Sequence, residues 1–129
     1  MNSVPVFDIA APQLYRCQVH RYFSGLSRLY VSAFKPYQTT PAFFLLFSDV
    51  AYFEGPMGWE SADFRLAPHD ECVALLLETG IIGEAVRQFP EAYAAVTEAA
   101  NLYKVHTPRT CVRLIAGSAA LLPEIPASL

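Results

Sequence analysis

Charged side chains are scarce in this chain of 129 residues. Lys, Arg, Asp and Glu make up 16% of the sequence, and the formal net charge is −3. About 25% charged residues is usual in a globular domain. A disordered chain and a strongly basic nucleic-acid-binding domain both need more charge than this. The composition therefore excludes disorder, and we expect no nucleic-acid partner.

Long hydrophobic runs are also missing. The longest uninterrupted apolar stretch is 42–47, whereas a membrane-spanning helix needs about 20 such residues. The first residues, MNSVPVFD, contain neither the basic segment nor the hydrophobic run of a secretory signal. The sequence therefore predicts a cytoplasmic protein with no membrane partner.

Cysteine is sparse, and its number is odd. Three cysteines in a chain long enough to form its own core favour free thiols over a disulfide framework. Each cysteine has a histidine nearby in the sequence, which raises a zinc-site hypothesis. The pairs are Cys17 with His20, Cys72 with His69, and Cys111 with His106. His69 and Cys72 could share one face of a helix. In the other two pairs, an offset of three or five along a strand sends the side chains to opposite faces, so we expect no bound metal.

Recognisable catalytic motifs are lacking as well. The sequence contains no G-x-S-x-G, no H-E-x-x-H and no phosphate-binding glycine loop. Cys72 lies near the start of an expected helix beside His69, but Asp70 and Glu71 would raise the pKa of its thiol. We assign no catalytic residue and no cofactor, and the sequence favours a protein without enzymatic activity.

Apolar and aromatic residues are what the chain has in excess. They make up 53% and 13% of the sequence, respectively. A small domain leaves a large fraction of its surface exposed, so surplus apolar side chains require a further surface to cover them. The composition therefore predicts self-association, as a homodimer or a larger homo-oligomer.

Hydrophobic periodicity predicts strands at both ends of the chain. Residues 13–23 and 27–35 alternate between apolar and polar side chains, which predicts a β-hairpin. Residues 42–54 begin as a strand apolar on both faces, with a possible bend at Ser48 and Asp49, and residues 59–66 return after a glycine-rich turn. Further strands are expected at 102–106 and 109–116.

A helical period replaces this alternation after Ala67. Pro68 suits the first turn of a helix, Asp70 and Glu71 suit its positive end, and Gly80 suits its end. We therefore predict an α+β fold. It consists of a single domain over 1–129, a mainly antiparallel sheet of about five or six strands, and two or three helices within 68–101 packed on one face.

Charge is distributed unevenly along the chain, because both ends are basic and the middle is acidic. If the C-terminal strand lies beside the N-terminal hairpin, basic and aromatic side chains share one sheet face. The candidate ligand-binding residues are Arg16, His20, Tyr22, Arg28, Tyr30 and Arg113. Such a face suits an acidic protein or a small anionic ligand. The alternative is a solvated face that acidic helices of the same chain or a second copy neutralise.

A second candidate surface lies around the turn at 55–58. Tyr52, Met57 and Trp59 are residue types enriched at protein interfaces, and we predict that they form an interaction surface. Glu54 and Glu60 would suit acid–base chemistry if they faced each other across the turn.

Two functional hypotheses result. The first is a small binding or interaction domain that forms homo-oligomers. The second is a small enzyme or ligand-binding protein, in which an aromatic-lined pocket holds an anionic ligand through Arg or His.

Overall fold

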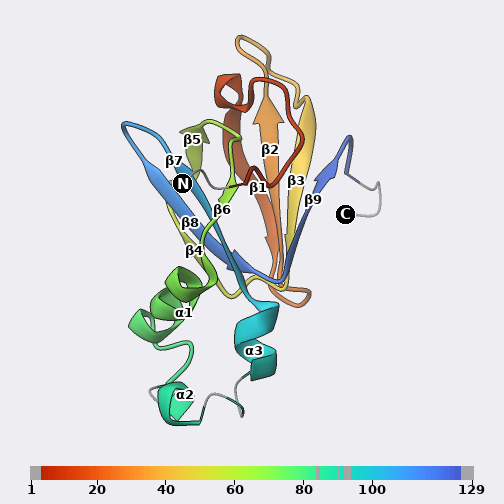
Figure 1. The fold of residues 1–129 in the computed structure, drawn as a ribbon. Helices are drawn as coiled ribbons and strands as arrows, with labels where there is room; N and C mark the ends of the chain where they lie inside the picture. The colour runs from red at the N-terminus through yellow and green to blue at the C-terminus, as the bar shows by residue number, and fades with distance from the viewer. Residues whose placement is uncertain (1–3, 84, 90, 92–93, 126–129) are drawn as a thin grey trace.

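The structure is a computed structural model that describes residues 4–83, 85–89, 91 and 94–125. Its strands form two antiparallel sheets with few helices (Figure 1). The five-stranded sheet has the order β5-β1-β2-β3-β9, and the four-stranded sheet has the order β4-β8-β7-β6. The elements are β1 (Arg16–Phe23), β2 (Arg28–Phe34), β3 (Phe43–Ser48), β4 (Tyr52–Glu54), β5 (Gly58–Glu60), β6 (Arg65–Leu66), β7 (Asn101–His106), β8 (Cys111–Ala116), β9 (Ser118–Leu122), α1 (His69–Glu78), α2 (Ala85–Gln88), α3 (Ala94–Ala99) and a 3₁₀ turn at Pro12–Leu14.

The main core lies between the two sheets. Inward side chains of both sheets form one buried cluster that includes Leu45, Phe47, Phe64 and Leu114. The rings of Phe47 and Phe64 are 5.1 Å apart between centroids, as is usual for packed aromatic pairs. A mainly antiparallel α+β structure is thus confirmed, but the single sheet expected from the sequence is wrong.

The chain passes from one sheet to the other at two adjacent bends. Asp49, with φ 54°, lies between β3 and β4, and Gly117 lies between β8 and β9. The Gly117 N–H donates to the Ser48 carbonyl oxygen at 2.9 Å. A Cβ on Gly117 would lie 3.1 Å from the Cβ of Asp49, so the close approach favours glycine. The β3–β9 and β4–β8 pairs are therefore one ribbon that bends into both sheets.

These bends explain the errors in the predicted strands. Residues 42–54 form two strands, β3 and β4, in different sheets, and the bend at Asp49 is where the sequence allowed one. The outward residues of β3 are half-buried, so the strand is not covered on both faces. Residues 59–66 likewise divide into β5 and β6. The sequence pattern gave no sign of β9.

The N-terminal segment covers an opening between the sheets. The Val6 N–H donates to the Phe64 carbonyl oxygen at 2.9 Å, and Pro5 forms a β-bridge with Arg65 beside β6. The ring of Phe7 lies 6.0 Å from those of Phe47 and Phe64. In Figure 1 this segment runs across the front of both sheets, so it extends the edge of the four-stranded sheet and adds to the core.

Helix α1 packs on the outer face of the four-stranded sheet. Its start differs by one residue from the prediction, because Pro68, expected at the first helical position, is the extended residue just before His69. Gly80, the expected stop, follows the end of the helix with φ 77°. Cys72, Leu75 and Leu76 form a second buried cluster, together with residues of β7 and β8. Within the described ranges, no helix is long and apolar enough to cross a membrane. In Figure 1, α2 and α3 lie beyond the ends of the sheets.

Candidate binding surface

The outer face of the five-stranded sheet gathers basic and aromatic side chains. We call this surface the basic-aromatic face. Its residues are Arg16, His20, Arg21, Arg28, Phe23, Tyr30, Phe34 and Phe44. Four of the six predicted ligand-binding residues belong to it, namely Arg16, His20, Arg28 and Tyr30.

A β-bulge in β1 decides which side chains reach this face. The register with β2 shifts between Val19 and Arg21, so His20 is the extra residue. The His20 ring contacts the outer side of β3, 5.4 Å from the ring of Phe44. Beyond the bulge, Tyr22 pairs with the inward residue Leu29, so it lies on the opposite side from the one that alternation predicts. Tyr22 is therefore not part of the basic-aromatic face.

Two arginines of this face lie over aromatic rings. The Arg16 Cζ is 4.5 Å from the centroid of Phe34, and the Arg21 Cζ is 4.8 Å from that of Phe23. Such cation–π contacts contribute about 0.5–1 kcal/mol each at exposed sites. They keep both guanidinium groups against the sheet, and Arg16 also donates from Nη2 to the Gln38 carbonyl oxygen at 3.4 Å. A guanidinium has five N–H donors, so each group keeps donors for a further partner.

Acidic side chains are scarce in the strands around these arginines. Strands β1, β2, β3 and β9 contain no Asp or Glu, and Glu60 of β5, opposite Arg16, is the one acidic residue within the strands of this sheet. Within the described part of the chain, Arg16, Arg21 and Arg28 form no ion pair. Among the strands of this sheet, only Glu60 offsets the three arginines, so this face carries a net positive charge on a chain whose net charge is negative.

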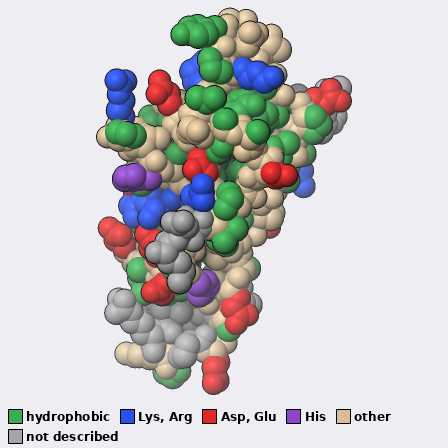
Figure 2. All heavy atoms as spheres, turned by 45° about the horizontal axis from the view of Figure 1, so that its top comes forward, with side chains coloured by type: hydrophobic (Ala, Val, Ile, Leu, Met, Phe, Trp, Pro, Cys, Tyr) green, Lys and Arg blue, Asp and Glu red, His purple; other side chains and the backbone are tan. Residues whose placement is uncertain are grey.

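The outer face of the four-stranded sheet has a row of cations that are paired with acids. Arg65, Lys104 and Arg113 are aligned across β6, β7 and β8. Their partners are Asp63 at 2.9 Å, Glu71 at 2.7 Å and Glu54 at 2.7 Å, respectively. On the side seen in Figure 2, basic and acidic side chains accordingly lie next to one another. Arg113 belongs to this sheet, so it does not share a face with Arg16 as predicted.

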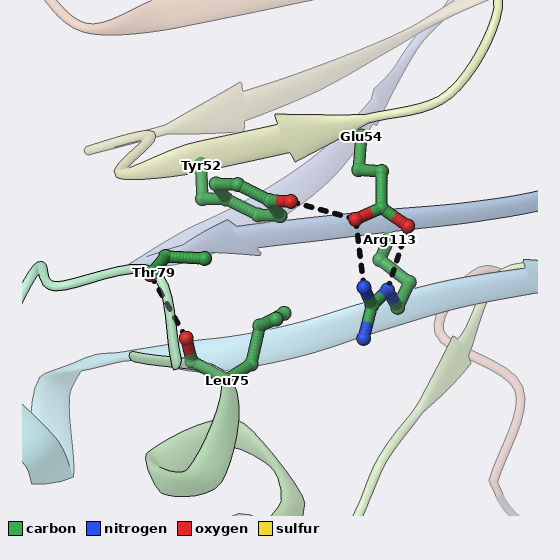
Figure 3. A network of polar contacts seen from close by, with 5 residues as sticks. All are labelled: Tyr52, Glu54, Leu75, Thr79 and Arg113. Atoms are coloured by element: carbon green, nitrogen blue, oxygen red, sulfur yellow. Dashed lines mark hydrogen bonds and ion pairs between the residues drawn. The ribbon is translucent and has the colours of Figure 1, made fainter. Parts of the chain in front are cut away.

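Glu54 is the centre of a polar network on this sheet (Figure 3). Arg113 donates from Nε and Nη2 to the two carboxylate oxygens at 2.9 and 2.7 Å, and the Tyr52 hydroxyl donates to Oε1 at 2.6 Å. The hydrogen bonds from Arg113 lower the pKa of Glu54, and the bond to Glu54 raises the pKa of Tyr52. Glu60 belongs to the other sheet, so the two carboxylates do not form an acid–base pair.

An apolar groove lies between β1 and β4, where the two sheets meet. It has a volume of about 350 Å³, and Tyr22, Tyr52 and Met57 line it together with Val19, Leu29, Val50, Ala51 and Phe53. The predicted interaction residues Tyr52 and Met57 are therefore neighbours. Trp59 is a correction: it is 5% exposed in the core, and its Nε1 donates to the Ser61 carbonyl oxygen at 3.0 Å.

The cysteines differ in exposure. Cys17 and Cys72 are buried, and Cys111 is exposed. Burial raises the pKa of the Cys17 thiol to about 12. His106 and Cys111 are direct cross-strand neighbours, so they share a face, contrary to the argument from spacing. Among the described residues, no group of three or more His, Cys, Asp or Glu side chains is placed to hold a metal ion.

We consider five hollows on the described part of the surface, with volumes of about 250 to 400 Å³. None of the five is lined by Arg16, His20 or Arg113. The basic residues expected to anchor an anion thus lie outside these hollows. Comparison with protein-family models, curated proteins and solved structures finds no significant match to this chain. Its function must be argued from the geometry of the chain itself.

Proposed function

We propose that this protein is an interaction domain that self-associates, and that its basic-aromatic face binds an acidic segment of a partner protein. The observation that carries the proposal is a set of three arginines on one sheet face, Arg16, Arg21 and Arg28, which form no ion pair with any described residue. An arginine presents a fork of N–H donors that matches a carboxylate in two hydrogen bonds. Acidic side chains are therefore the chemistry that this face fits best.

The layout of the face suits an extended segment. Arg16 pairs with Phe34 and Arg21 with Tyr30. Because His20 is bulged, the two arginines are four strand positions apart, which corresponds to about 13 Å at the usual rise of a strand. Arg28 lies on β2, about 4.8 Å away in the hydrogen-bonding direction. A peptide of five or six extended residues covers this area. The half-buried rings of Phe23 and Phe44 offer apolar contact between the charges.

Self-association is supported by apolar side chains that the fold leaves exposed. Tyr22 and Met57 are exposed at the rim of the apolar groove, and Leu121 is exposed on β9. The pocket hypothesis has less support, because the residues expected to anchor an anion line none of the hollows described above. We therefore place the proposed site on the open face.

The acidic-partner proposal is tested with a fluorescein-labelled 12-residue peptide of alternating Glu and Leu. Anisotropy titrations at 50 mM salt compare the wild type with the double variant R21A/R28A. Charge-assisted hydrogen bonds contribute about 1.5–3 kcal/mol each, so we expect at least a tenfold loss of affinity. Affinity should also fall as salt is raised.

The matched control is R109A. Arg109 is exposed in the turn between β7 and β8, and its replacement removes one positive charge away from the basic-aromatic face, as each substitution of the double variant does on it. We expect its affinity to stay within twofold of the wild type. Equal losses in R109A and R21A/R28A would contradict a localised site. Tighter binding of a 15-residue oligothymidine than of the peptide, lost in R21A/R28A, would replace the acidic partner with a nucleic acid.

A further inference from the structure

The four sheet edges are protected to different degrees. Strands β4, β5 and β6 have three, three and two residues, and each contains a charged side chain. The N-terminal segment also covers β6, through the Pro5–Arg65 bridge. Short edge strands, charges and covering segments are the usual devices against edge-to-edge pairing.

Strand β9 has none of these devices. It has five residues, Ser118–Leu122, without a charge or a proline, and it pairs with β3 in unbroken register. Within the described residues, no strand pairs with its other side. Its backbone N–H and C=O groups on that side are therefore free to pair with a further strand.

The side chains around this edge are apolar. Strand β3 also carries no charge, and its half-buried Phe44 and Leu46 lie opposite Leu122 and Ala120. Leu121 pairs with the fully buried Leu45, yet it is 40% exposed. No described strand therefore lies beside Leu121 on the side where a further strand would pair.

From these observations we infer that β9 pairs antiparallel with β9 of a second copy and joins two five-stranded sheets into one. The inference rests on the self-association in the proposed function and names its interface. Centred on Ala120, this pairing places Ala119 of each copy opposite Leu121 of the other. On the inner side, each small Ala119 then lies beside a large Leu121 of the other copy. On the outer side, Ala120 of one copy lies directly opposite Ala120 of the other.

Charge does not oppose this contact. Arg28 lies in the third strand from the joint, about 12 Å from the two-fold axis at the usual strand spacing. The two copies of Arg28 are then about 24 Å apart, well beyond the screening length of about 8–10 Å at physiological salt. Strand β9 has no charged side chain, so a charged partner strand could not form an ion pair with it. A second copy of β9 is also uncharged and therefore leaves no charge unpaired at the contact.

The pairing has a consequence for binding. A two-fold axis that relates adjacent antiparallel strands is perpendicular to the sheet, so both basic-aromatic faces lie on the same side. A partner with two acidic segments would bind both faces, and its second binding event would be intramolecular. The dimer is therefore a bivalent surface.

The test uses sedimentation velocity on the full chain at 50 µM with A120K, A120E and an equimolar mixture of the two. Ala120 is exposed, and each variant places like charges directly opposite each other at the axis, which disfavours pairing. We expect a dimer for the wild type, monomers for both variants alone, and a dimer again in the mixture. Circular dichroism checks that the variants fold.

The control is L66K, because Leu66 is 41% exposed on the edge strand β6, where the N-terminal segment covers the backbone. This variant should remain a dimer. A dimer in A120K would overturn the β9 interface and leave self-association standing, and so would folded variants that stay monomeric when mixed. A monomeric wild type would overturn both. Should A120K fail to fold, protection of the 118–122 amides from hydrogen exchange, lost on dilution of the wild type, decides the same question.

Discussion

The two sheets present cations on their outer faces in opposite ways. On the four-stranded sheet, Arg65, Lys104 and Arg113 each have a carboxylate partner, and helix α1 covers the adjoining apolar area. On the five-stranded sheet, Arg16 and Arg21 lie over aromatic rings without an ion pair among the described residues, and no described helix packs there.

This difference separates stability from binding. A cation with a carboxylate partner has much of its hydrogen-bonding capacity occupied, whereas a cation over a ring keeps N–H donors for another molecule. The same residue type thus has an internal role on one sheet and a proposed external role on the other. Four predictions, each based on substitutions of single residues, test this separation.

The largest expected effect is on thiol reactivity. Cys111 is exposed on the outer side of the four-stranded sheet, whereas Cys17 is buried under the five-stranded sheet with its pKa raised to about 12. At a given pH, a shift from 9 to 12 lowers the thiolate fraction about a thousandfold. We expect one fast phase with a disulfide reagent at pH 8, and its loss in C111S. Fast labelling of a second cysteine in native protein would contradict the burial.

The next effect concerns the helix-covered face. Leu76 is 1% exposed between α1 and the four-stranded sheet, and L76A should lower the free energy of unfolding by about 2–5 kcal/mol because it leaves a cavity. Urea denaturation measures this. The comparison variant is L46A on the outer face of the five-stranded sheet, where Leu46 is half-buried and the loss should be smaller. Equal losses would mean that both faces are equally covered.

A smaller effect distinguishes two arginines. R113A removes the ion pair with Glu54, which is partly exposed, so it should cost about 0.5–1 kcal/mol of stability and leave peptide affinity unchanged. R28A should change stability by less than about 0.5 kcal/mol, because the side chain of Arg28 forms no hydrogen bond or ion pair within the described residues. It should nevertheless weaken peptide binding. Urea denaturation measures the stability of both variants, and anisotropy measures their peptide affinity. We expect R113A to lower mainly stability and R28A to lower mainly affinity, and a weakened peptide affinity in R113A would contradict this.

The smallest effect is a pH dependence. Hydrogen bonds from Arg113, and then from Tyr52, lower the pKa of Glu54 in the folded state. Its contribution to stability is therefore complete above its ordinary pKa of about 4.3 and is lost as the pH falls through the lowered value. Relative to the wild type, E54Q should be less stable at pH 6, and the gap should close towards pH 3. Solvent screening keeps it below about 1 kcal/mol. If the stability difference between wild type and E54Q widened as the pH fell, the prediction would be contradicted. The variant Y52F should show a smaller stability difference from the wild type, with the same sign and the same pH dependence.

The local elements were predictable, and their assembly was not. The alternation in 13–23 and 27–35 corresponds to β1 and β2, and the pattern of Pro68, Asp70 and Gly80 marks α1. Part of the candidate face followed from the same alternation, since Arg16 and Arg28 do share it. Tyr22 was misplaced because a bulge reverses the alternation, and bulges leave no reliable mark in a single sequence. The absence of acids from β1 and β2 is visible in the sequence, and it was the signal that could have found Arg21.

The sequence by itself determined the scarcity of charge, the apolar excess, the first hairpin and the first helix, because these depend on composition and on neighbours along the chain. Only the tertiary structure decided that the strands divide between two sheets, that Arg113 lies apart from Arg16, and that β9 is the edge strand of the five-stranded sheet. These features depend on which distant strands pair and on bends at Asp49 and Gly117. Strand pairing is decided by contacts between residues far apart in the sequence, and a local pattern does not contain them.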